Sequence, residues 1–357
     1  MTKENAIPKS NVFNSKFLSV TFFVCSIMVI GIHSYNITTE TIDTFAGYFQ
    51  SFLCHGVFIA AVPTFFFLSG FLFFRNVLST SDVLKKLATR AKSVLMPFLV
   101  WSTLYLVIFT LASFTPFFSS DGVSFAPLEI LKGIVFYKYC FPLWYMYQLI
   151  IFLLLTPLIN ILLKKRYLSF GILIVLTIIA IFIKDSIDVE MFPDNNRSLF
   201  QINYFCYYFA GGVAVKFSDV FLKLKKKIDY KRGVVTIISG VMLVIFAFAQ
   251  SIIFEERIIF FYDRVFVPFV FVCLFIFLWS IYEKIPYIKN ASTMVVYAVH
   301  PFIANILGNL FSGALKKLPN TLEFVLVLVI VSTLSFTFAY IIKRFIKPLN
   351  FVLSGGR

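Results

Sequence analysis

Charged residues are scarce in this chain, and their scarcity decides its class. Only 14% of the 357 residues are charged and 60% are hydrophobic, whereas a soluble domain carries about a quarter charged residues. Apolar runs of roughly 20 residues recur along the whole length, which is what an α-helix needs to cross a bilayer. The short alternating segments of a transmembrane barrel are missing. The composition therefore predicts an all-α integral membrane protein.

Cysteine and histidine are also scarce. The five cysteines are scattered, with no CxxC pair, so neither a disulfide framework nor a cysteine metal site is indicated. Three dispersed histidines and no intramembrane carboxylate cluster provide no metal-ligand set, so we expect no bound metal. The net charge of +15 does not indicate nucleic-acid binding, because the basic residues fall between the hydrophobic runs rather than in one patch.

The hydrophobic runs predict a bundle of about ten transmembrane helices. They cover approximately 17–35, 50–74, 94–115, 141–163, 168–184, 199–216, 234–253, 265–282, 293–312 and 322–342. Most of the 32 lysine and arginine residues lie in the two tails and the even-numbered loops, and most acidic residues lie in the odd-numbered loops. Basic loops stay in the cytoplasm, so we expect both termini to be cytoplasmic.

Domain organisation follows from the same pattern. We expect a cytoplasmic N-terminal tail at 1–16, a single transmembrane domain at 17–345, and a cytoplasmic C-terminal tail at 346–357. No hydrophilic stretch is long enough to form a separate domain. Any chemistry must therefore occur inside the bundle or at its two mouths.

The first hydrophobic run ends in a candidate functional residue. Residues 17–36 read FLSVTFFVCSIMVIGIHSYN, with His33 near the outer membrane face and the polar residues Tyr35 and Asn36 behind it. An ionisable residue at the end of an apolar span is a functional candidate. The topology places His55 near the outer end of the second span and His300 in the inner half of the ninth.

Several motifs in order resemble one family. They are IMVIGIHSYN at 27–36, AVPTFFFLSGFLFFRN at 61–76, ATRAKSVLMPFLVWS at 88–102, PLWYMYQLIIFLLLTPLI at 142–159 and, more weakly, YAVHPFI at 297–303. As a set they resemble the acyltransferase-3 family of membrane proteins, over roughly residues 15–345. The family includes enzymes that O-acetylate bacterial surface polysaccharides.

The resemblance implies a reaction and a catalytic residue. It implies transfer of an acyl group, usually acetyl, from cytoplasmic acyl-CoA to a hydroxyl of a surface glycan or lipid-linked sugar, in the bacterial plasma membrane. His33 matches the family's essential histidine. An imidazole can remove the hydroxyl proton near neutral pH, or can carry the acyl group itself. The alternative for His33 is a helix-end residue in the headgroup region.

Two arginines are candidates for binding CoA. Arg75 and Arg90 lie on the predicted inner face, and guanidinium groups bind phosphate oxygens in a bidentate manner. Arg90, seven residues before Pro97, matches a family arginine. The alternative for both is ordinary retention of positive charge on the cytoplasmic side.

Other residues are candidates for binding the sugar acceptor. Trp144 and Tyr147 begin the fourth span, where aromatic rings either stack on sugars or anchor in the membrane interface. His300, before Pro301, matches a recurrent family histidine and is either structural or a second proton carrier. Together with Tyr35 and Asn36, these residues form the predicted substrate-binding set.

Residues in the second span also have two interpretations. Pro63 and the pair Ser69-Gly70 either open a pocket beside His33 or serve close helix packing.

The chain departs from the family pattern in two places. Many members carry an arginine eleven residues before the essential histidine, and here that position is Phe22. Paired arginines often precede the proline of the third span, and here Arg90 is followed three positions later by Ser93. These two differences are consistent with an alternative function, that of an export component for a polysaccharide or lipid-linked sugar without transferase activity. A third interpretation is a structural membrane subunit.

Overall fold

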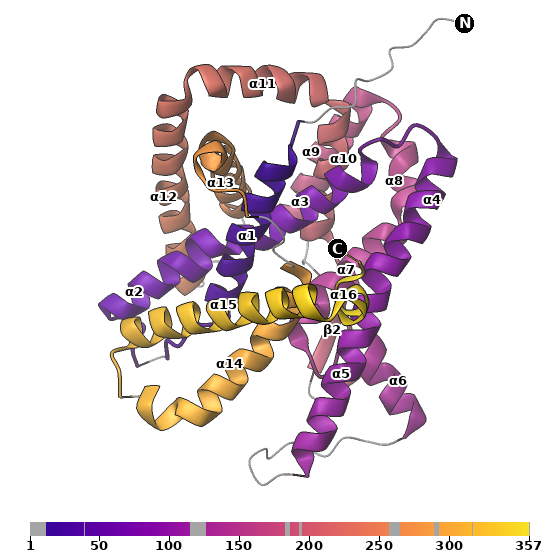
Figure 1. The fold of residues 1–357 in the computed structure, drawn as a ribbon. Helices are drawn as coiled ribbons and strands as arrows, with labels where there is room; N and C mark the ends of the chain where they lie inside the picture. The colour runs from indigo at the N-terminus through magenta and orange to yellow at the C-terminus, as the bar shows by residue number, and fades with distance from the viewer. Residues whose placement is uncertain are drawn as a thin grey trace, which may run out of the picture.

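The computed structural model describes residues 12–38, 40–114, 126–182, 186–192, 195–256, 265–288, 293–315 and 317–356. They form a bundle of helices with one small hairpin (Figure 1). The first half contains α1 (Ser15–Ile32), α2 (Phe45–Ser51), η1 (Phe52–Val57), η2 (Phe58–Ala60), α3 (Ala61–Phe74), α4 (Thr80–Arg90), η3 (Ala91–Leu95), α5 (Met96–Ser113), α6 (Pro127–Val135), η4 (Phe141–Leu143), α7 (Trp144–Leu154) and α8 (Thr156–Leu162). The second half contains α9 (Arg166–Phe182), β1 (Ser186–Phe192), β2 (Asn195–Gln201), α10 (Ile202–Lys216), α11 (Ser218–Tyr230), α12 (Arg232–Glu256), α13 (Val267–Ile281), η5 (Tyr282–Lys284), α14 (Thr293–Leu315), α15 (Asn320–Phe345) and α16 (Lys347–Ser354).

Helices able to cross a membrane dominate the described part of the chain. Seven are long and apolar enough, or up to nine if each of two bent pairs is one span. The bent pairs are α7 with α8, at 58°, and α10 with α11, at 85°. The apolar helix α9 is shorter. A helical, multi-pass architecture is therefore confirmed, while the count of ten spans and the cytoplasmic location of both termini stay predictions.

The third predicted span is part of a longer helical segment. We expected it at 94–115, but α4, η3 and α5 run continuously from Thr80 to Ser113. A capping box starts this segment: the side chain of Ser79 accepts from the backbone of Asp82, and the Asp82 carboxylate accepts in return. Because α4 is amphipathic rather than apolar, the span predicted from hydropathy did not include α4. Arg90 consequently lies in a helix and not in a loop.

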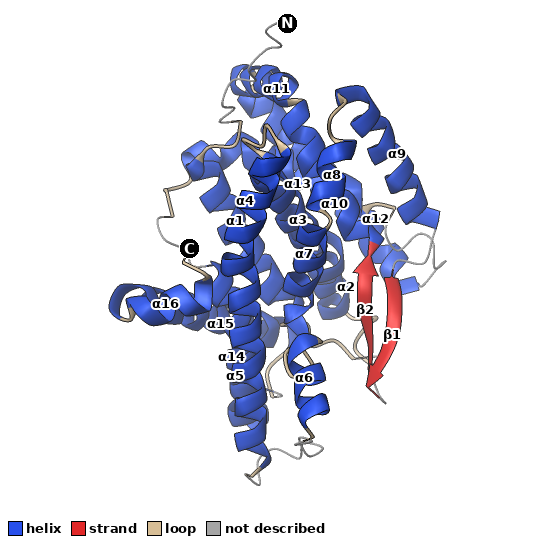
Figure 2. Cartoon of the chain, turned by 90° about the vertical axis from the view of Figure 1, so that its right-hand side faces the viewer, coloured by secondary structure: helices blue, strands red, loops and turns tan. Residues whose placement is uncertain are grey.

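Helix α7 is tied to a β hairpin that an all-α prediction did not include (Figure 2). Strands β1 and β2 pair antiparallel between α9 and α10. The buried amide of Gln148 donates to the carbonyl oxygen of Ser198 at 2.8 Å and accepts from the backbone N–H of Gln201 at 3.1 Å. A polar side chain in an apolar span thus finds its partners in the exposed backbone of β2.

The C-terminal segment, expected as a tail, contains helix α16, which packs against α5. Trp101 Nε1 donates to the carbonyl oxygen of Leu353 at 3.0 Å. Gly355 follows in a left-handed conformation, φ +67°, and a side chain there would meet the backbone of Ser93 in η3. Only glycine combines this φ with such a close approach. The C-terminal segment therefore covers η3, directly after Arg90.

The closest helix crossing in the bundle joins α3 to α10. Gly70 of α3 lies against the carbonyl oxygen of Tyr208, and Gly211 of α10 lies against the carbonyl oxygen of Phe67. Each glycine therefore faces the backbone of the other helix, as small residues do where membrane helices approach closely. This assigns Gly70 to packing, one of the two roles expected for the Ser69-Gly70 pair.

Replacing Gly70 by alanine should destabilise the protein, because the new Cβ would overlap the carbonyl oxygen of Tyr208. Overpacking of this kind costs about 1–3 kcal/mol. The matched control is Gly171→Ala in α9, where nothing lies within 4 Å of an added Cβ. Thermal unfolding of the purified variants in detergent should show a lower midpoint for Gly70→Ala alone. Equal midpoints would contradict the close crossing.

Candidate active site

Two of the three histidines meet where α1 ends. His33 caps the C-terminus of α1, its backbone N–H donating to Val29. Its ring lies 5.1 Å from that of His300 in α14, at an angle of 44°. His33 is exposed, whereas His300 is fully buried. The structure thus pairs an accessible imidazole with a buried one.

This pairing shows that two predicted depths do not hold together. We expected His33 near the outer face and His300 in the inner half of its span, but rings 5.1 Å apart lie at one level. Ser19 Oγ donates to the carbonyl oxygen of Ile288 at 2.5 Å, so the chain that leads into α14 lies beside the second turn of α1. This contact between distant segments sets where α14 starts along α1, which span boundaries alone did not predict.

The polar residues after His33 make separate contacts. The ring of Tyr35 lies 4.8 Å from that of His55, which is carried by the π-helical turn η1. The Asn36 side chain accepts from Gln50 Nε2 at 2.7 Å and donates to the carbonyl oxygen of Asn320 at 3.4 Å. Asn36 therefore connects the α1–α2 loop to the start of α15, which is a structural role.

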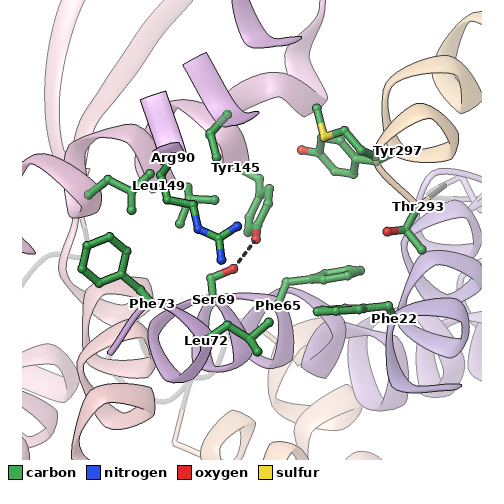
Figure 3. Close-up of a pocket in the computed structure, with 13 residues that line it drawn as sticks. Phe22, Phe65, Ser69, Leu72, Phe73, Arg90, Tyr145, Leu149, Thr293 and Tyr297 are labelled. Atoms are coloured by element: carbon green, nitrogen blue, oxygen red, sulfur yellow. Dashed lines mark hydrogen bonds between the residues drawn. The ribbon is translucent and has the colours of Figure 1, made fainter. Parts of the chain in front are cut away.

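A cavity of about 310 Å³ lies within the bundle beside α3, α4, α7 and α14 (Figure 3). Its lining is mostly apolar, with one guanidinium and a few hydroxyl groups. The lining residues are Phe22, Phe65, Ser69, Leu72, Phe73, Arg90, Val94, Tyr145, Leu149, Leu153, Thr293, Met294 and Tyr297. A mainly apolar pocket with few convergent polar groups is the usual form of a small-molecule site.

Arg90 enters this cavity because of the local helix geometry. It is the last residue of α4, and the π-helical turn η3 follows at once. Such turns shift the side chains that follow and recur at functional sites. In Figure 3 the guanidinium points toward Ser69 and Tyr145, whose hydroxyl groups are hydrogen bonded at 3.2 Å. No carboxylate of the described residues forms an ion pair with Arg90, so its charge can meet an anionic ligand.

Two stacked aromatic rings lie in the cavity at the position where many family members carry a second cation. Phe22 stands where many family members carry arginine, and its ring stacks on Phe65 at 5.8 Å with planes 9° apart. Both rings line the cavity.

One cavity residue, Tyr297, lies against the histidine pair. Its ring lies 5.7 Å from Tyr145, which also lines the cavity, and 6.1 Å from His300, which does not. Tyr297 and His300 are three residues apart and share a face of α14. Ring contacts therefore connect the cavity lining through Tyr297 to His300 and His33.

Of the eight predicted site residues, only Arg90 is among those that line the cavity. His33, His300, Tyr35 and Asn36 make the contacts described above, and the other three lie elsewhere. Arg75 ends α3, and its carbonyl oxygen accepts from Lys86 Nζ. Trp144 packs on Tyr204 at 5.1 Å, in the aromatic cluster between α3, α7 and α10. Tyr147 packs on Tyr137 at 5.3 Å.

Sequence reasoning missed Ser69 as a paired hydroxyl, and it missed Tyr145 and Tyr297 as cavity residues. A usable signal existed for Tyr297, which precedes His300 by three residues and therefore shares its face. Pro63 lines a different cavity, of about 270 Å³, between α3, α9, α10 and α13. No group of three potential metal ligands occurs among the described residues.

Fold and site together define a class, a multi-pass helical membrane protein with a mostly apolar cavity and a histidine pair that one cavity residue contacts. A family model described as an acyltransferase domain matches residues 23–344. The chain therefore belongs to the acyltransferase-3 family, which confirms the resemblance drawn from the sequence motifs.

One curated protein is similar over part of the chain. The succinoglycan biosynthesis protein ExoH of Rhizobium meliloti (strain 1021) is 30% identical over 120 residues. The match covers 32% of this chain and 32% of ExoH. No solved structure matches the chain.

Asn36→Ala should lower stability, because it leaves the buried Gln50 amide without its 2.7 Å partner. The expected cost is about 1–3 kcal/mol, measured by thermal unfolding in detergent. Gln50→Ala should cost a similar amount, and the double variant less than the sum of the two. Strict additivity would show that Asn36 and Gln50 do not support each other.

Proposed function

We propose that this protein transfers an acyl group, acetyl in the first instance, from cytoplasmic acetyl-CoA to a hydroxyl of a cell-surface or exopolysaccharide. The observation that carries the proposal is the cavity itself. It has the Arg90 guanidinium on one side and ends at Tyr297, one helical turn from the His33–His300 pair. Family membership and the partial similarity to a succinoglycan biosynthesis protein support the same reaction class.

Donor binding is assigned to Arg90. Phosphates of CoA would sit against its guanidinium, which lines the cavity and has no carboxylate partner among the described residues. The apolar wall of Phe65, Phe22 and Leu149 would then surround the uncharged pantetheine arm and exclude water. Arg75 was a second candidate. It is not part of the cavity lining, so we propose for it at most a role at the cytoplasmic mouth.

His33 acts on the acceptor hydroxyl in one of two ways. As a base, it removes the hydroxyl proton while the oxygen bonds to the acyl carbon; the carbon–sulfur bond breaks, and the proton passes to the CoA thiolate. As an acyl carrier, its ring nitrogen bonds to the acyl carbon while the carbon–sulfur bond breaks. The hydroxyl oxygen then attacks the acyl carbon, the carbon–nitrogen bond breaks, and the hydroxyl proton passes to the CoA thiolate. Both routes need an accessible imidazole, and His33 is exposed.

The acceptor reaches His33 from the outer side in this proposal. Both termini are cytoplasmic, and the protein lies in the bacterial plasma membrane. Tyr35, next to His33 and 4.8 Å from His55, is the best-placed member of the predicted acceptor set. Asn36, Trp144 and Tyr147 are held in packing or hydrogen-bond contacts, so any effect they have on the acceptor is indirect.

An export component for a polysaccharide or lipid-linked sugar is the alternative function. The observation that favours it is the Phe22–Phe65 stack, which stands where a second donor-binding arginine is common in the family. Arg90 in the same cavity argues for the transferase over export of a neutral polysaccharide, because such an export path needs no cation beside an apolar wall.

The acetyl content of the surface polysaccharide tests the proposed function. We compare cells with wild-type protein, cells with His33→Ala and cells without the protein, at matched membrane levels. Acetyl ester should disappear equally in the last two while the amount of polymer stays constant. A fall in surface polymer with unchanged acetylation would instead identify an export component.

Arg90→Ala should raise the KM for acetyl-CoA about 10- to 100-fold in membrane vesicles, the effect of losing a charge-assisted hydrogen bond of about 1.5–3 kcal/mol. Lys92→Ala is the matched control, because this exposed lysine belongs to the same basic cluster. Its KM should stay within twofold of wild type. Equal effects of the two variants would remove Arg90 from the donor site.

A further inference from the structure

We propose that His300 is a positioning residue: it accepts a hydrogen bond from His33 and thereby determines which ring nitrogen of His33 faces the substrates. This inference rests on the proposed function, since it gives His33 its orientation for acyl transfer. It replaces the earlier expectation that His300 binds substrate.

The protonation of His300 follows from its contacts. Its Nδ1 lies 3.3 Å from the carbonyl oxygen of Val296. A carbonyl oxygen can only accept, so Nδ1 carries the proton in this contact and Nε2 of the neutral ring is left as an acceptor. Pro301 has no N–H, so the Tyr297 carbonyl four residues earlier has no helical donor, and Tyr297 also interacts with His300 through its backbone. The ring is therefore anchored to its own helix on the Nδ1 side.

The Nε2 atom of His300 can accept a hydrogen bond. Nε2 is buried and has no hydrogen-bond partner among the described residues. Leaving a buried polar atom unpaired costs about 1–3 kcal/mol, so a partner is expected. His33 and Tyr297 are the described aromatic side chains whose rings lie against His300, and His33 is the nearer, at 5.1 Å against 6.1 Å.

A hydrogen bond between the two rings is within reach. Ring nitrogens lie about 1.1 Å from the ring centre, so rings 5.1 Å apart can bring two nitrogens to roughly 2.9 Å, a normal hydrogen-bond length. That length is reached when both nitrogens lie on the line that joins the ring centres, and rotation of the exposed His33 ring about χ2, a soft torsion, is the movement that we propose aligns them. The buried ring stays fixed while the exposed ring adjusts.

The bond would prepare His33 for either catalytic route. With one N–H directed at His300 Nε2, the other nitrogen of His33 presents its lone pair to the acceptor hydroxyl or to the acyl carbon. When that nitrogen takes the hydroxyl proton, the positive charge is stabilised by a charge-assisted hydrogen bond to His300. The proton stays on His33 until the CoA thiolate takes it. A carboxylate often orients a catalytic histidine; here no carboxylate of the described residues forms an ion pair with either ring.

Two substitutions of His300 distinguish the role of its hydrogen-bond acceptor atom from the role of its side-chain volume. Glutamine places an amide oxygen near the position of Nε2, whereas phenylalanine keeps the ring volume without an acceptor. We would measure transfer from radiolabelled acetyl-CoA to de-O-acetylated surface polysaccharide in membrane vesicles, with wild type and His33→Ala in parallel. His300→Phe should lower kcat about 100-fold with KM for acetyl-CoA within twofold. His300→Gln should stay within tenfold of the wild-type kcat.

The outcomes distinguish the two proposals. Activity in His33→Ala, or none in wild type, overturns the proposed function. If His33→Ala is inactive but His300→Phe and His300→Gln have equal kcat, the positioning role alone is overturned. A raised KM in His300→Phe would likewise remove it, since that result means substrate binding.

A measurement that does not depend on activity completes the test. Nitrogen-15 NMR of the histidine-labelled protein resolves the tautomer of each ring, and single substitutions assign the three histidines. We expect one fixed tautomer for His33 and a hydrogen-bonded Nε2 acceptor for His300 in wild type. A mixture of tautomers at His33 would overturn the proposal.

Discussion

The close crossing of α3 and α10 is the constraint on which the site depends. Glycines on both helices let their backbones touch, Gly70 against Tyr208 and Gly211 against Phe67. In a membrane, moving apolar side chains from lipid into a helix interface changes their free energy little. Close packing of this kind therefore contributes much of the free energy of helix association. With α3 held on one side, its opposite side presents Phe65 and Ser69 to the cavity. One face of α3 therefore packs against α10, and another face lines the cavity.

The cavity places one positive charge in an apolar wall. Arg90 stands near the Ser69–Tyr145 hydroxyl pair, and Phe22 stacks on Phe65 opposite. Charge in a low-dielectric surrounding interacts more strongly with an anionic ligand than it would in water. A single guanidinium in a mostly apolar cavity is suited to a ligand that is anionic at one end and uncharged along its arm, which is the form of the donor that we propose, acetyl-CoA.

The histidine pair connects to the cavity lining through Tyr297. His33 is accessible, and His300 is buried and anchored to its own helix. A rigid buried partner can orient a mobile exposed ring without contacting substrate itself. The second π-helical turn, η1, brings His55 to Tyr35 nearby. All three histidines of the chain therefore gather where α1 ends, although they are far apart in the sequence.

The sequence by itself determined the class and the family, and it proposed His33 and Arg90 as site residues. Scarce charge and long apolar runs are sufficient for a helical membrane protein, and motif order was sufficient for the family. His33 was found because an ionisable group at the end of an apolar span is unusual, and Arg90 because it precedes the Pro97 motif. These are local properties of the chain, which composition and spacing record directly.

Only the tertiary structure decided which side chains meet. Trp144, Tyr145 and Tyr147 are alike in sequence, yet among the three only Tyr145 lines the cavity. The rotation of each helix about its axis selects between them, and that rotation is set by crossings, bends and π-helical turns that hydropathy does not record. The different depths expected for His33 and His300 did not hold together for the same reason, because the start of α14 is set by contacts with α1. Pairs such as His33 and His300 depend on contacts between distant segments, and no local pattern contains them.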